Sequence, residues 1–450
     1  MKTTNLCWSL VLALFLIATG CEKEALETEV LEGYDLEARV ENRALRHTKQ
    51  YDADVATAWY NLLADLNQNT PYFNPQSARI FAYSGLALYE SVLPGMPSYQ
   101  SVFSQMSGEI IVFDGKPKDY YWPASANAAL AEISRSLLQD FPQPANLAAI
   151  NELEEQLNEE FLESISAEQL ERSAEFGTYV AEMVYNWSKT DGTFTPCPPY
   201  VPSGEPGTWV PTPPMYFPAA GACQGDLRTF IPNIAETVMP GPPPPYSTDP
   251  ASEFYQMNMA VYEITQDLTS EELLIIQAWR DILGVNLNRP SHMMKLTADL
   301  IDEENVNLEE ASVLLAKEGI AIFDAIVAIF NAKFEYELLR PVTYIHGVLG
   351  YTSWQGVYPA PQHPSYPATT GVTVAALEVL EAYFGSDYAF EDTTQEELYG
   401  VFYYDSFDEM IEANALSRTH SGLNYQLSVD VGEEIGIAVG ELINEIEFKK

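Results

Sequence analysis

The chain has 450 residues, of which 47% are hydrophobic and 19% charged, so it can bury a large core and has a globular rather than a disordered composition. It carries 65 acidic against 22 basic residues, which gives a formal charge of −43. A surface this acidic repels phosphate backbones, which argues against nucleic-acid binding and favours solubility through self-repulsion.

Residues 1–20 have the pattern of an export signal. Lys2 supplies the positive start, and WSLVLALFLIA (8–18) supplies an apolar stretch too short to span a membrane. The letters ATGC, ending at Cys21, resemble the lipobox of bacterial lipoproteins, in which cleavage precedes a lipidated cysteine. We therefore expect a lipid anchor on Cys21, a flexible acidic tether over residues 21–50, and a place in the cell envelope, at the outer membrane or cell surface of a Gram-negative bacterium. An ordinary cleaved signal with a leftover cysteine is the alternative.

Most of the chain beyond residue 50 has the periodicity of amphipathic helices. The expected helices cover residues 54–68, 75–93, 127–141, 167–187, 270–283 and 307–339, and another follows Gly371. The middle of 307–339 is apolar nearly all round, which is typical of a helix at the centre of a bundle. Residues 108–115 alternate like a strand. The sequence predicts an all-α helical bundle over residues 51–450.

Residues 189–249 interrupt the helical pattern with a segment rich in proline and glycine. A spacer between domains would be polar, but this segment carries aromatic side chains such as Trp209 and Phe230. We therefore favour an irregular loop packed over the helices, with a pocket wall or lid as its functional form.

Two of the four cysteines lie outside the signal and the lipobox. They are Cys197 and Cys223, both in the irregular segment of a chain that we expect to be exported. We predict that they form a disulfide. Closing a loop of roughly 25 residues would stabilise the protein by about 3 kcal/mol in the chain-entropy model.

A pair of cations marks the end of the long helix. Lys333 and Arg340 stand close to two turns apart in KFEYELLRP, so both would project from one face of a helix that Pro341 ends. In an ordinary structural role, Lys333 would pair with Glu337 and Arg340 would cap carbonyls. Two later turns, HPSYPATTG and SRTHSGLNYQLS, each precede a helical pattern, and the free N–H groups of a helix start can bind an anion.

These three segments, in this order, resemble the signature of the vanadium-dependent haloperoxidases and type 2 phosphatidic-acid-phosphatase-like (PAP2) enzymes. The resemblance extends over roughly residues 54–440 and includes PQSARIFAYSGLALYESV and AWRDILGVNLNRPSHMMKL, in which His292 matches a family position. It implies an all-α helical bundle of the haloperoxidase/PAP2 type. It also implies that phosphate or vanadate is held by Lys333, Arg340, Ala368, Thr369 and Arg418.

The chain departs from the signature where the family has its histidines. The acid–base histidine falls on Thr370, the histidine that bonds vanadium or attacks phosphorus falls on Asn424, and a following aspartate falls on Ser428. Neither side chain at the histidine positions offers a basic nitrogen. The resemblance implies vanadate as cofactor, and Asn424 argues against it. His420 is the candidate for a rescuing base, whereas we assign His363 to ordinary structure.

Three functions are compatible with these residues. The first is an exported lipoprotein that keeps an oxyanion cradle for phosphate or vanadate, lacks the family reaction, and meets the membrane only through its lipid. The second is an active haloperoxidase or acid phosphatase with a rearranged site, and the third is a purely structural member. The sequence contains no HExxH, no pair of CxxC motifs, no phosphate-binding glycine loop and no GxSxG.

Overall fold

The computed structural model describes residues 47–69, 74–139, 144–282 and 284–450. The export signal, Cys21 and nearly all of the proposed tether lie outside the described residues. Thr48–Gln50 form a 3₁₀ turn, η1, in which the Thr48 hydroxyl is buried and donates a hydrogen bond to the carbonyl of Val92. Residues 48–50, which we expected to belong to a tether, therefore form a turn whose first residue is buried.

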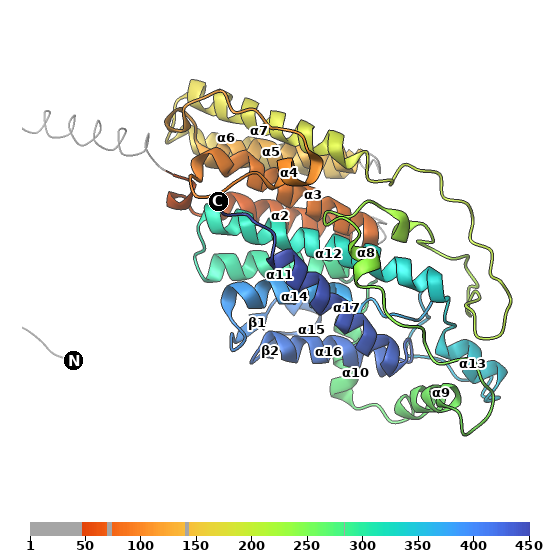
Figure 1. The fold of residues 1–450 in the computed structure, drawn as a ribbon. Helices are drawn as coiled ribbons and strands as arrows, with labels where there is room; N and C mark the ends of the chain where they lie inside the picture. The colour runs from red at the N-terminus through yellow and green to blue at the C-terminus, as the bar shows by residue number, and fades with distance from the viewer. Residues whose placement is uncertain (1–46, 70–73, 140–143, 283) are drawn as a thin grey trace, which may run out of the picture. The chain divides into compact units, whose positions relative to one another are not determined.

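The first part of the described chain is a group of packed helices (Figure 1). They are α2 Asp54–Gln68, α3 Asn74–Val92, α4 Val102–Ser107, α5 Trp122–Leu138, α6 Pro144–Leu162 and α7 Ala167–Ser188. Helix α3 packs against α5, α7 and the long helix α12 Leu308–Tyr336. Glycines allow the closest of these approaches, because a Cβ at Gly85 of α3 would lie 2.8 Å from the Cα of Ala316 in α12.

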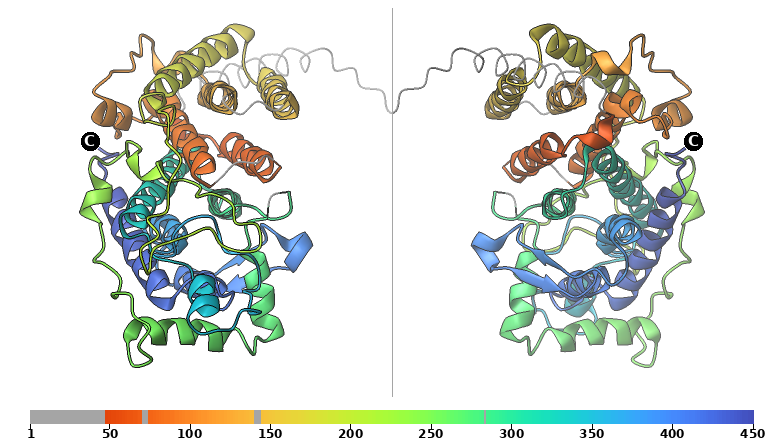
Figure 2. Two further views of the ribbon diagram at one scale, coloured as in Figure 1. Left: turned by 90° about the vertical axis from the view of Figure 1, so that its right-hand side faces the viewer. Right: turned by 90° about the vertical axis from the view of Figure 1, so that its left-hand side faces the viewer.

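The second part adds helices around α12, several of which are seen nearly end-on in Figure 2. They are α8 Ile234–Thr237, α9 Glu253–Ile264, α10 Ser270–Ala278, α11 Arg289–Glu303, α13 Pro341–Gly347, α14 Thr370–Phe384, α15 Glu396–Tyr399, α16 Phe407–Thr419 and α17 Gln426–Asn444. Strands β1 Phe390–Asp392 and β2 Phe402–Tyr404 pair antiparallel, with Phe390 opposite Tyr404. The all-α class is confirmed.

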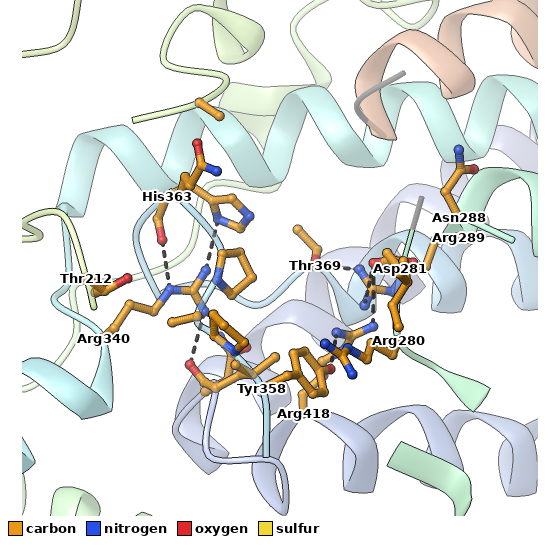
Figure 3. Close-up of a pocket in the computed structure, with 18 of the residues that line it drawn as sticks. Thr212, Arg280, Asp281, Asn288, Arg289, Arg340, Tyr358, His363, Thr369 and Arg418 are labelled. Atoms are coloured by element: carbon orange, nitrogen blue, oxygen red, sulfur yellow. Dashed lines mark hydrogen bonds and ion pairs between the residues drawn. The ribbon is translucent and has the colours of Figure 1, made fainter. Parts of the chain in front are cut away.

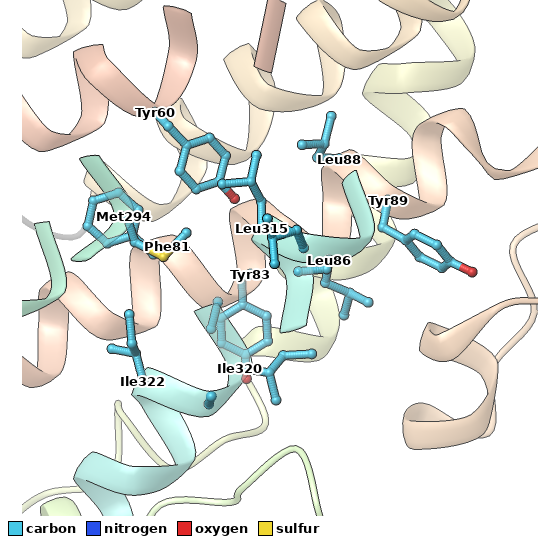
Figure 4. Packing of buried hydrophobic residues seen from close by; sticks show 14 of the residues in the cluster. Tyr60, Phe81, Tyr83, Leu86, Leu88, Tyr89, Met294, Leu315, Ile320 and Ile322 are labelled. Atoms are coloured by element: carbon cyan, nitrogen blue, oxygen red, sulfur yellow. The ribbon is translucent and has the colours of Figure 1, made fainter. Parts of the chain in front are cut away.

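The main core lies where α2, α3, α11 and α12 meet (Figure 4). Residues from each of these helices, among them Tyr60, Phe81, Met294 and Ile320, are almost fully buried there. The apolar middle of α12 thus lies at the centre of the bundle, as its sequence predicts. Among the residues that the structure describes, no helix is long and apolar enough to cross a membrane.

Helices α14 and α17 touch through their backbones. A Cβ at Gly432 of α17 would lie 2.5 Å from the carbonyl oxygen of Ala368 and 2.8 Å from Oγ1 of Thr370. A Cβ at Gly371 or Gly436 would likewise meet the backbone of the facing helix. Since only glycine permits this approach, the contact holds the first turn of α14 firmly against α17.

Two local expectations are wrong. Residues 108–115 form no strand. Ile110 and Val112 are exposed while Ile111 and Phe113 pack on the core, so the alternation is real, but among the described residues no strand pairs with it.

The long helix also ends earlier than expected, at Tyr336. Glu337 takes a left-handed conformation with φ 50°, and its carbonyl accepts a hydrogen bond from the backbone N–H of Trp209. Pro341 begins α13 rather than ending α12. Lys333 and Arg340 consequently lie on two separate elements.

Residues 189–249 pack over the helices. Trp209 and Phe230 are buried, and the carboxylate of Asp324 in α12 accepts hydrogen bonds from the backbone N–H groups of Phe230 and Ile231, at 2.8 and 2.9 Å. Cys197 and Cys223 form a disulfide with Cα atoms 5.9 Å apart. The one-turn helix α8 also lies in this segment.

Candidate anion-binding site

A cavity of about 580 Å³ brings the three signature segments together (Figure 3). Its walls come from α11, α12, the first turn of α14, the turn before α14, the turn after α16, and the loop between Thr212 and Ala220. Lys333, Arg340, Thr369, Arg418 and Asn424 all line it. The loop thus supplies one wall of the cavity.

Lys333 is fully buried, and its ammonium group is bound to the main chain. Nζ donates to the carbonyl oxygens of Pro364, at 2.8 Å, and of Pro367, with a longer bond of 3.4 Å to Ser365. Burial, together with the charges of Arg340 and Arg289, lowers the pKa of Lys333 well below its usual range. Three carbonyl acceptors nevertheless match the three N–H bonds of the charged form.

Arg340 is bound in a similar way. Nε donates to the carbonyl of His363 at 2.8 Å, and Nη1 donates to the carbonyl of Leu423 at 3.0 Å and to Oδ1 of Asn424 at 3.3 Å. Lys333 and Arg340 therefore join the second and third signature segments to the end of α12 and the start of α13. Most of their N–H groups are used by protein atoms.

His363 lines the cavity, although we expected it to have only a structural role. Nη2 of Arg340 lies 3.1 Å from its Nδ1. Nδ1 also lies 3.3 Å from the carbonyl oxygen of Pro364, so the tautomer of the ring decides whether this nitrogen accepts from Arg340 or donates to that carbonyl. Burial and the neighbouring charges of Lys333 and Arg340 hold the pKa of His363 well below its usual range, so the ring is neutral at pH 7.

Asn424, where the sequence resemblance leads us to expect the ligand histidine, acts as a structural bridge. Its Nδ2 donates to the carbonyl of Ser365 at 2.8 Å and to the Ser365 hydroxyl at 3.2 Å. Ser428 is buried nearby, with its hydroxyl 3.4 Å from that of Ser365. The amide thus holds the second segment to the third.

Two expectations about the second segment need correction. Thr370 does not line the cavity: it is 1% exposed, and its hydroxyl faces Gly432 of α17. Ala368 is fully buried, and its N–H donates to the carbonyl of Ser428 at 2.6 Å, so it is not available to an anion. Thr369, the N-cap of α14, is the residue that faces the cavity.

Arg418 has a second arginine beside it, Arg289, which the sequence analysis missed. Nη1 of Arg418 donates to the Tyr358 hydroxyl at 3.0 Å and Nη2 to the Trp279 carbonyl at 2.6 Å. Nη1 of Arg289 donates to Oγ1 of Thr369 at 2.8 Å. Asp281 lies between the two guanidinium groups, 3.6 Å from Arg289 and 3.8 Å from Arg418.

Several nitrogens of these two arginines have no hydrogen-bond partner in the part of the chain that the structure describes. They are Nε and Nη2 of Arg289 and Nε of Arg418. Both side chains are buried, with 3% and 5% of their surface exposed. Buried donors without partners are costly, so these nitrogens are suited to an anion that enters the cavity.

The sequence does carry a signal for Arg289. Asn288 caps α11, and Pro290 lies in its first turn, which is a common pattern at a helix start. This pattern places Arg289 at the first helical position. Reading the segment only for His292 missed it.

Two histidines with expected roles lie outside the cavity. His420 does not line it; Nε2 of His420 lies 3.4 Å from the carboxylate of Glu272 in α10, so it is not placed to rescue chemistry there. His292 is buried, with Nε2 2.8 Å from the Asp392 carboxylate and its ring against Trp279. Its contacts position the segment whose carbonyl binds Arg418.

The Asn424 side chain does not fit vanadium bonded directly to it. Both hydrogen-bonding ends of the Asn424 amide are engaged, and an amide nitrogen has no lone pair to give a metal. Among the residues described here, no cluster of three or more His, Cys, Asp or Glu side chains is arranged to hold a metal ion.

Comparison with known proteins supports the fold. Residues 313–448 match the family model described as the VCPO second helical-bundle domain. The chain has the fold of the vanadium haloperoxidase/PAP2 superfamily, which confirms the resemblance carried by its motifs. A search of curated proteins gave no match.

Two solved bacterial structures show the extent of the likeness. A vanadium-dependent iodoperoxidase shares 24% identity over 89% of this chain and 98% of its own, with a TM-score of 0.81. A vanadium-dependent chloroperoxidase in its holo form shares 16% identity over 85% of this chain and 94% of its own, with a TM-score of 0.62.

Proposed function

We propose that this protein binds an oxyanion, phosphate or vanadate, in the cavity and lacks the haloperoxidase and phosphatase reactions of its fold relatives. One observation carries the proposal: Arg289 and Arg418 are buried beside each other in the wall of one cavity, and both have N–H groups without a hydrogen-bond partner among the described residues. The start of α14 adds the positive end of a helix dipole. Thr369 and Asn424 supply no basic nitrogen for chemistry on that anion.

Calorimetric titration with phosphate and with vanadate tests binding. We expect binding of both anions, and a loss of at least about tenfold in affinity in Arg418→Gln, because hydrogen bonds to charged groups contribute about 1.5–3 kcal/mol. Assays with a chromogenic phosphate monoester, and for bromination with added vanadate, should show no turnover. Absence of binding would instead support the purely structural role, which the main-chain bonds of Lys333 and Arg340 favour.

A working enzyme is the second candidate, and the placement of His363 favours it. His363 is the one histidine among the described residues that line the cavity, and imidazole is the side chain that most often serves in general acid–base catalysis. Turnover that disappears in His363→Gln but persists in His420→Gln would establish this candidate over the first.

We also propose that the protein is a lipoprotein anchored through Cys21 in the envelope of a Gram-negative bacterium. The support is the lipobox-like ATGC after an apolar export signal. Cys21→Ser should move the protein from the membrane fraction to the soluble fraction. Mass spectrometry of the wild-type N-terminus should find an acylated cysteine; an unmodified residue there would exclude the anchor.

A further inference from the structure

The cavity is far larger than a bare oxyanion requires. Its volume of about 580 Å³ lies within the range of roughly 300–1,000 Å³ that is typical of clefts for drug-sized organic ligands. A water molecule, by comparison, takes about 30 Å³ of liquid volume. An inorganic anion at the two arginines would leave most of the cavity to solvent.

Much of the remaining wall is apolar. Ile326 and Phe330 stand one turn apart on α12, and Val372 lies in the first turns of α14. Across from the helices, the loop contributes Met215 and Phe217, which are 63% and 46% exposed. Large apolar side chains at a cavity wall can be covered by the apolar part of a ligand.

The polar end of the cavity has the geometry of a two-point anion receptor. Nε and Nη2 form one edge of the Arg289 guanidinium, and neither nitrogen has a hydrogen-bond partner in the described chain. Such an edge fits two oxygens of a carboxylate or a phosphate. The bond from Nη1 to Thr369 fixes the orientation of the group, and Asp281, at 3.6 Å, is too distant to hydrogen-bond with it.

Lys333 and Arg340 are less suitable for the head of the ligand. Their N–H groups are directed at carbonyls of the second and third segments and at Asn424. In Figure 3, Arg340 and His363 lie on one side of the view, and Arg289, Asp281 and Arg418 lie on the other. The available donors are thus concentrated around Arg289 and Arg418.

We propose that the cavity binds an organic anion. Its oxyanion head, a carboxylate or a phosphate monoester, accepts hydrogen bonds from Nε and Nη2 of Arg289, with Arg418 beside it. Its apolar body lies along Ile326 and Phe330 toward the loop. This inference rests on the proposed oxyanion-binding function and adds the position of the head and the class of ligand.

The test is a calorimetric titration of the purified protein with inorganic phosphate, phenyl phosphate, benzoate and phenol. We expect phenyl phosphate to bind at least about tenfold more tightly than phosphate, because a buried aromatic ring adds affinity. Benzoate should bind through the same arginine edge, and phenol, which lacks the anionic head, should bind at least about tenfold more weakly than benzoate.

Two substitutions test separately the contacts to the anionic head and the contacts to the apolar body of the ligand. Arg289→Lys keeps the charge and loses the two-point edge, so all three anions should bind at least about tenfold more weakly. Arg135→Lys, in α5 and outside the cavity lining, is the matched control. Phe217→Ser should weaken phenyl phosphate and benzoate and leave phosphate unchanged. Val201→Ser, elsewhere in the irregular segment 189–249 and outside the cavity lining, should change none of these affinities.

The outcomes distinguish this inference from the function on which it rests. If phosphate binds as tightly as phenyl phosphate, and Phe217→Ser changes no affinity, the proposal of an organic ligand is wrong. Oxyanion binding is then unaffected. Anion affinities unchanged in Arg289→Lys overturn the position of the head. No binding of any anion overturns the proposed function itself. If Arg289→Lys does not fold, the comparison of ligands on the unmodified protein and on Phe217→Ser still decides.

Discussion

Nδ2 of Asn424 donates a 2.8 Å hydrogen bond to the main-chain carbonyl of Ser365. Asn424 therefore fastens one signature segment to another. Its contribution should be visible in stability.

Asn424→Ala is expected to lower the free energy of unfolding by about 1–3 kcal/mol, because it leaves the buried carbonyl of Ser365 without this donor. Urea denaturation measures the change. Gln156→Ala, which removes an amide bonded to Glu160 on the exposed face of α6, should stay within about 0.5 kcal/mol. Equal effects of the two substitutions would contradict the bridging role.

We expect a histidine at position 370 to destabilise the protein and to produce no activity. Thr370 faces Gly432, where the backbones of α14 and α17 touch, so Thr370→His overpacks the contact and should cost about 1–3 kcal/mol. It should also restore no phosphatase or bromination activity, even when combined with Asn424→His. Thr369→His, which faces the cavity, should be tolerated better in thermal denaturation. A stable and active Thr370→His protein would show that the helix contact is assigned incorrectly.

Lys333 should matter for folding more than for ligand affinity. Lys333→Met leaves several buried carbonyls without their donor and should lower the free energy of unfolding by at least about 3 kcal/mol. Arg289→Met removes a single side-chain hydrogen bond and should cost less, while abolishing anion binding. In denaturant titration, Lys333→Met should therefore lose more stability than Arg289→Met. In calorimetry, Arg289→Met should lose more anion affinity than Lys333→Met.

Glu318 in α12 gives stability a pH dependence. It is fully buried, and burial raises the pKa of its carboxyl well above the usual range, a shift that the nearby Thr297 hydroxyl opposes only in part. The folded protein thus keeps a proton that the unfolded chain loses above the ordinary carboxyl pKa. Stability from this group is present at low pH and is lost as pH rises toward the folded pKa.

Glu318→Gln should remove that dependence. Relative to the unmodified protein, the variant should gain about 1.4 kcal/mol for each pH unit above the ordinary carboxyl range, up to the pKa of the folded state. Urea denaturation between pH 5 and 8 measures the difference. Glu205→Gln, at an exposed site in the loop, is the control and should leave the slope unchanged. Parallel stability curves for Glu318→Gln and the unmodified protein would refute the prediction.

The disulfide between Cys197 and Cys223 encloses the loop residues that line the cavity. Replacing both cysteines with serine should cost about 3 kcal/mol, from the greater freedom of the unfolded chain. It should also weaken ligand binding, since the loop wall is then less ordered. Thermal denaturation with and without reductant, together with calorimetry, measures both effects; a fully reduced protein with unchanged stability would contradict them.

The all-α class and the convergence of the three signature segments could both be predicted from local sequence patterns. Helices such as α2 and α7 match their periodicity closely because an amphipathic stripe is a property of adjacent residues. The spacing of the family motifs predicted that Lys333, Arg340 and Arg418 would lie together, and all three line one cavity.

What the sequence missed depends on contacts between distant residues. Glu337 ends α12 in a left-handed turn whose carbonyl binds Trp209, and that partner lies in a loop without periodicity. Thr369 rather than Thr370 faces the cavity, since Thr370 lies against Gly432 of α17. Arg289 was missed because its importance lies in the N–H groups that its neighbours leave unbonded, which no spacing reveals.

The glycine contact between α14 and α17 has a further consequence. Gly371, Gly432 and Gly436 bring the two backbones into contact, so the packing of α14 on α17 does not depend on the side chains that line the cavity. Selection can then change what the cavity recognises by altering its lining residue by residue, with the frame of the molecule left in place.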